Sequence, residues 1–143
     1  MSEPFQRSPS GIVIDLPDPL RQWLGEMAAE AGRDAVDPGG AVHRRLLGPI
    51  DPTADHDDPL IELQRQFGVE GSLSILVATV NATEINEEEA EQWIRALQLI
   101  LAATAARLSV LEEGDVARLD EEAAQTLTTL QALISLMIDA LDA

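Results

Sequence analysis

The segment from Glu87 to Val110 constrains the fold most, because it predicts a long helix that is apolar around most of its circumference. Its large apolar residues recur mainly at intervals of three and four, at Ala90, Trp93, Ile94, Leu97, Ile100, Leu101 and Leu108. Further alanines fill the sides of this stripe. A surface helix has one apolar stripe, whereas a helix that is apolar on most sides is enclosed by other helices. The sequence therefore predicts a helical bundle built around this segment.

A second strong signal follows near the C-terminus, where we expect a helix that begins after Asp120. Its apolar residues repeat at heptad spacing and form a seam, which is widened by neighbouring leucine and isoleucine residues. The seam consists of Leu127, Leu130, Ile134, Met137 and Leu141. A short turn joins this helix to the preceding one, so the two should pack antiparallel.

Start and stop signals divide the remainder into shorter elements. We expect a helix capped by Asp18 with Pro19 at its first position, which ends near Gly32, and a short helix over residues 41–47. Apolar spacing from Leu60 onward predicts another helix, then a turn at Gly68 and Gly71, and a further helical segment over 72–81. Asn86 with Glu89 forms the pattern of a capping box at the start of the long helix.

The N-terminal region is the one part that does not predict helix. Residues 11–16 are rich in β-branched side chains and predict a strand, but no other segment offers a partner strand. We therefore expect an extended segment that lies on the helices, preceded by a flexible arm at 1–10. The predicted fold is a single all-α domain over residues 1–143, a bundle of about five helices with a short extended N-terminal segment.

The net charge of -17, from 26 acidic residues against nine arginines, limits the partners. Such a charge repels nucleic acids and anionic membranes, although it also fits an acidic protein that mimics nucleic acid and occupies a basic partner. Residues 1–10 lack the pattern of a secretion signal, and the apolar run at 127–141 is shorter than the ~20 residues of a membrane span. We therefore expect a cytoplasmic protein that binds neither nucleic acid nor membrane.

The acidic segment 51–58 offers the only candidate metal site. Several carboxylates and one imidazole lie within eight residues and are of the type that holds a hard divalent cation. The spacing lacks the glycine and distal glutamate of a calcium loop, and two of the aspartates are equally explained as caps of the next helix. The candidate ligands are Asp51, Asp55, His56, Asp57 and Asp58.

The arginines suggest contacts with acidic groups. Arg44 and Arg45 follow His43 in the only basic cluster, which either grips a phosphate or acidic peptide or pairs with nearby carboxylates. Arg95 and Arg107 lie on roughly one side of the long helix, and we expect structural pairing, with Glu62 or Glu89 as partner. No pairing of nucleophile and base occurs and cysteine is absent, so we expect neither an enzyme nor a bound cofactor.

The segment from Trp93 to Val110 resembles an actinobacterial domain-of-unknown-function family, numbered twenty-seventeen. The matching positions are Trp93, Ala96, Leu97, Arg107, Leu108 and Val110. The runs at 45–49 and 127–131 are also similar, whereas Gln98 and Leu101 stand where the family carries asparagine and arginine. Genes of this family often lie near that of the Clp protease adaptor. The resemblance therefore implies a role in regulated proteolysis or stress response.

Three functions remain open at this point. The leading hypothesis is a non-catalytic interaction or regulatory protein, whose partner is a second copy in a homodimer or another protein, such as a Clp-related one. It would bind through the seam of the last helix and through Arg44 and Arg45. The alternatives are a metal-assisted hydrolase that uses the acidic segment 51–58, and an acidic mimic of nucleic acid.

Overall fold

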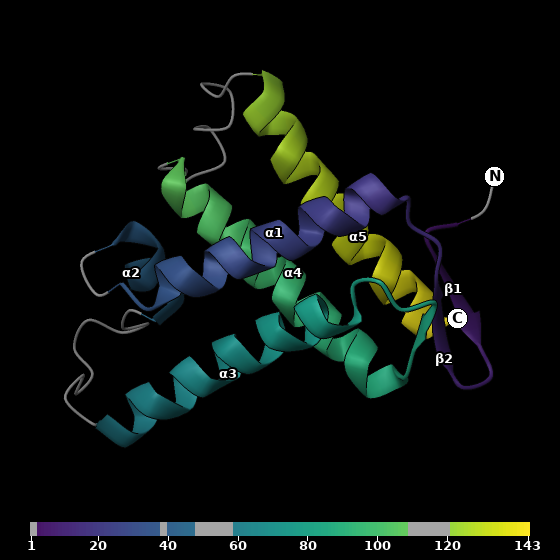
Figure 1. Ribbon diagram of the computed structural model, residues 1–143, viewed down its shortest axis with the longest axis horizontal. Helices are drawn as coiled ribbons and strands as arrows, with labels where there is room; N and C mark the ends of the chain where they lie inside the picture. The colour runs from purple at the N-terminus through teal and green to yellow at the C-terminus, as the bar shows by residue number, and fades with distance from the viewer. Residues whose placement is uncertain (1–2, 38–39, 48–58, 109–120) are drawn as a thin grey trace.

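The computed structural model describes residues 3–37, 40–47, 59–108 and 121–143, which form five helices with a small three-stranded sheet at one end (Figure 1). In chain order the elements are β1 Phe5–Ser8, β2 Gly11–Ile14, α1 Asp18–Ala35, α2 Ala41–Leu47, α3 Pro59–Thr79, β3 Glu84–Ile85, α4 Glu87–Arg107 and α5 Glu121–Asp142. The fold is therefore mainly α, as predicted, but it is not purely all-α.

Helix α4 lies in the middle of the molecule and contacts each of the other four helices (Figure 1). Its buried residues occupy most of its circumference, which confirms the enclosed position predicted from their spacing. Trp93, Leu97 and Ile100 are completely buried. The start of α4 also follows the prediction: the Asn86 side chain accepts a hydrogen bond of 2.7 Å from the Glu89 amide, and the Glu89 carboxylate accepts one of 3.0 Å from the Asn86 amide.

From residue 3 onward the N-terminal region differs from the prediction, because most of the expected arm and the extended segment form paired strands. Strands β1 and β2 form an antiparallel hairpin in which Phe5 lies opposite Ile14, and β3 adds to the other edge of β2. The Phe5 ring packs edge-on against Trp93, with 6.1 Å between the ring centroids. Only Phe5 in β1 is apolar and buried, so its alternation was too weak to predict a strand from the sequence.

Gly11 permits the close approach of β3 to β2. A Cβ atom at this position would lie 2.0 Å from the carbonyl oxygen of Ile85 and 2.8 Å from the Cα atom of Asn86. Both are backbone atoms, so neither can move aside without separating the strands. A glycine inside a strand commonly marks such an approach of two backbones.

Two helix boundaries also correct the prediction. The N-cap of α1 is Pro17 rather than Asp18, which lies inside the first turn, and α1 continues past Gly32 to Ala35. Helix α3 runs unbroken for 21 residues, so the turn expected at Gly68 and Gly71 does not form. Glycine costs a helix only about 1 kcal/mol relative to alanine, and burial of apolar side chains on α3 outweighs that penalty. The buried residues are Val69, Leu73 and Leu76.

The side chain of Arg21 joins the sheet to the helices. Its guanidinium donates four hydrogen bonds to backbone carbonyls, to Leu16 at 2.9 Å, Val80 at 2.9 Å, Ala82 at 2.8 Å and Ile14 at 3.0 Å. Val80 and Ala82 follow the C-terminus of α3, where unpaired carbonyls and the helix dipole favour a cation. In the described part of the chain no carboxylate forms an ion pair with this arginine, so its protein partners are the four carbonyl groups.

We expect Gly11→Ala to lower the free energy of unfolding by about 2–4 kcal/mol, because the new methyl group must displace β3. Urea denaturation measures this value. Gly68→Ala is the matched control, since Gly68 is an exposed helical residue whose added Cβ meets no atom within 4 Å. That change should raise stability by about 0.5–1 kcal/mol. Equal effects of the two substitutions would contradict the assigned role of Gly11.

We expect Arg21→Ala to lower the free energy of unfolding by about 2–4 kcal/mol, because four partly buried carbonyls lose a charged donor. Arg21→Lys should recover less than half of the loss, since an ammonium group cannot span all four acceptors. Arg95→Ala at an exposed position serves as control and should change stability by at most about 0.5 kcal/mol. A lysine variant as stable as the original chain would show that the fork geometry of Arg21 is dispensable.

Candidate functional site

The seam predicted for partner binding is used inside the chain. Leu127, Leu130 and Met137 are buried, and Ile134 and Leu141 are partly buried against the core. Helices α4 and α5 run in opposite directions and pack together along this seam (Figure 1). The antiparallel pairing predicted for them is therefore present. Leu127, Leu130 and Met137 are part of the core in this fold, and the partner-binding role expected of the seam stays a prediction.

The opposite face of α5 remains open to solvent. Leu136 and Ile138 flank the buried face on its two sides and are 38% and 39% exposed. By length and composition, α5 is the one helix of the described residues that could cross a membrane, and 28% of the window that meets this test is buried in the fold. The core helix of a globular protein commonly meets the same test, so this result is weak evidence for a membrane span. In this fold α5 packs on α4.

The proposed metal ligands Asp51, Asp55, His56, Asp57 and Asp58 lie outside the described residues. Within residues 3–37, 40–47, 59–108 and 121–143, no group of three or more histidine, aspartate or glutamate side chains is arranged to hold a metal ion. The metal-site hypothesis therefore stays a prediction about the segment 51–58.

The basic cluster lies on the short helix α2. His43 is partly buried, and its Nδ1 lies 2.6 Å from the carbonyl oxygen of Ala35, so this imidazole ties α2 to the end of α1. Arg44 and Arg45 are exposed side chains in the last turn of α2, where a positive charge is favourable to the helix dipole. Their position in the last turn of α2 is enough to account for two positive charges there, so a bound ligand is not needed to explain them.

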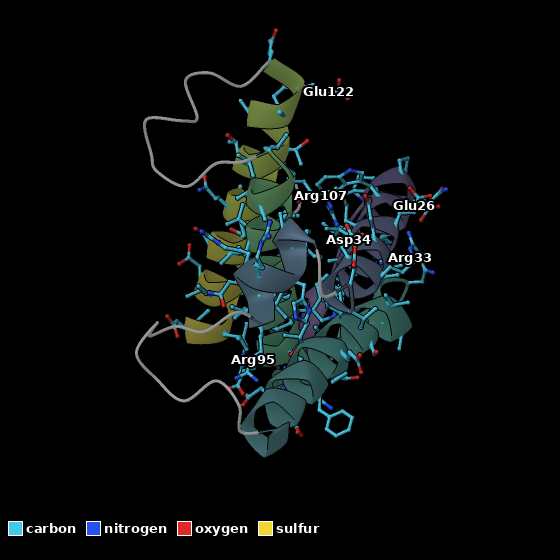
Figure 2. The ribbon with its side chains drawn as sticks, turned by 90° about the vertical axis from the view of Figure 1, so that its left-hand side faces the viewer. Glu26, Arg33, Asp34, Arg95, Arg107 and Glu122 are labelled. Carbon is cyan, nitrogen blue, oxygen red and sulfur yellow. The ribbon has the colours of Figure 1, made fainter. Side chains whose placement is uncertain are left out.

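Arg107 forms the ion pair expected of it, but with residues that the sequence did not indicate. Its Nε donates a hydrogen bond of 2.8 Å to Asp34 Oδ2, and Glu30 Oε1 lies 3.8 Å from the same nitrogen. The Nη2 atom lies 2.7 Å from Asp34 Oδ2 without the alignment of a hydrogen bond, so that contact is electrostatic. Both carboxylates belong to α1, which is far from α4 in the sequence and packs against it in the fold. Figure 2 shows Asp34 and Arg107 close to each other. Glu89, one of the two predicted partners, instead completes the capping box.

An open pocket of about 310 Å³ adjoins Arg107 where α1, α4 and α5 meet. Its two hydroxyl groups, on Thr104 and Thr126, already donate to the carbonyls of Ile100 and Glu122 in their own helices. The guanidinium faces Asp34 and Glu30, and Glu122 also lines the pocket. An excess of carboxylates around one committed cation disfavours an anionic ligand, and no described group there pairs a nucleophile with a base.

A larger open groove, of about 550 Å³, separates the outer faces of α1 and α3. On α1 the lining residues follow helical spacing and are mostly small, namely Ala28, Ala29, Gly32, Arg33 and Val36. On α3 they are Glu70, Leu73, Ser74, Val77 and Ala78. Because the side chains at the base of the groove are small, the backbone of a bound segment could approach the two helices closely. The surface of the groove is mainly apolar.

Exposed apolar side chains gather around this groove. Val36 is 47% exposed and Val77 is 44% exposed, and both line it. Phe67 is 62% exposed and lies seven residues before Ser74, so it falls on the same side of α3. Val36 and Val77 thus add exposed apolar surface to the borders of the groove. This α1–α3 groove is the candidate interaction surface.

The groove could not be predicted from the sequence for an identifiable reason. Gly32 indicated the end of the first helix, and Gly68 and Gly71 indicated a turn that would divide α3. A signal was available, because Gly25, Ala29, Gly32 and Val36 recur at helical spacing on α1. Periodicity alone cannot distinguish a stripe that faces the core from one that faces a groove.

Comparisons with models of protein families, with curated proteins and with solved structures found no match to this chain.

We expect Asp34→Ala to lower the free energy of unfolding by about 1 kcal/mol, because the pair with Arg107 is partly solvated. A double-mutant cycle with Arg107→Ala should give a coupling free energy of about 0.5–1.5 kcal/mol. The same cycle with Glu30 should give a smaller value, since Glu30 lies 3.8 Å from the Nε of Arg107. Urea denaturation measures all the variants. A coupling of zero for Asp34 would leave this ion pair without a structural role.

Proposed function

We propose that this chain is a non-catalytic interaction protein that binds a helical segment of a partner in the α1–α3 groove. The groove itself is the observation that carries the proposal. It is concave and mainly apolar, and it is bordered by the exposed side chains of Val36 and Val77. Docking of an amphipathic helix into an apolar groove is a common mode of peptide recognition.

The use of the other polar side chains supports this assignment. Ser72 is 1% exposed and donates a hydrogen bond of 2.7 Å to Gln92. The Trp93 indole donates one of 2.7 Å to the Thr79 hydroxyl. Together with Arg21 and Arg107, these groups hold elements of the fold together. Chemically distinctive side chains that serve folding in this way are not available for a reaction.

The wider biological setting is part of the same proposal and rests on sequence resemblance. Membership of the actinobacterial family, a cytoplasmic location and a link to regulated proteolysis would together make a Clp-related protein the first partner to examine. The metal-assisted hydrolase remains a hypothesis about residues 51–58, and elemental analysis of the purified protein tests it. The nucleic-acid mimic is the third hypothesis. It requires a stripe of carboxylates at phosphate-like spacing, which would bind a basic partner in place of nucleic acid.

We expect Val77→Asp to abolish capture of specific partners from a native lysate, because a carboxylate would be placed on the apolar wall of the groove. Ile138→Asp on the outer face of α5 is the matched control, since Val77 and Ile138 are β-branched and are 44% and 39% exposed. Quantitative mass spectrometry of the captured proteins measures the difference, and Clp components are scored explicitly.

Thermal denaturation of both variants verifies that each is folded. Loss of the same proteins with Ile138→Asp but not with Val77→Asp would place the interaction surface on α5 and refute the proposed site.

A further inference from the structure

No further inference is drawn: the strongest candidate, the apolar groove between α1 and α3 with the exposed side chains of Val36 and Val77 at its borders, is the surface already assigned to the proposed function, and nothing in the structure shows which molecule covers it.

Discussion

The hydrogen bonds of the Arg21 guanidinium hold the end of the sheet against helices α1 and α3. One side chain on α1 is held by carbonyls from the end of β2, from the approach to α1 and from the exit of α3. Leu16 and Ile14 lie 5 and 7 residues before Arg21, whereas Val80 and Ala82 lie 59 and 61 residues after it. A planar group with five donors can bond all four carbonyls at once, whereas a lysine ammonium has only three donors. These bonds tie the N-terminal part of α1 to the segment that follows α3.

Helix α4 completes the framework, because each of the other helices packs on it. Two polar contacts fix how α3 lies against α4: Ser72 with Gln92, and Trp93 with Thr79. They orient α3 so that Leu73, Leu76 and Val80 are buried. A helix that buries one side must expose the other, and on α3 the exposed side carries Phe67, Ser74, Val77 and Ala78. The candidate interaction surface thus follows from the same packing that stabilises the domain.

The carboxylates of α1 do not all have the same surroundings. Asp34 and Glu30 face Arg107 and join α1 to α4. Glu26 lies on the outer side of α1, away from that ion pair (Figure 2). One helix therefore carries both carboxylates that hold the fold together and carboxylates that face solvent.

The sequence by itself determined the features that depend on neighbouring residues. The capping box at Asn86, the enclosed character of α4, the short helix at 41–47 and the seam of α5 were all readable, because helical spacing and caps act within one or two turns. Only the tertiary structure decided what each face contacts. It paired β1 with β2 and packed Phe5 of this hairpin on Trp93 of α4, it continued α3 through two glycines, and it gave Arg107 its partners on α1. It also directed the small residues of α1 toward a groove. These outcomes depend on contacts between segments far apart in the chain, whose free energies no local pattern contains.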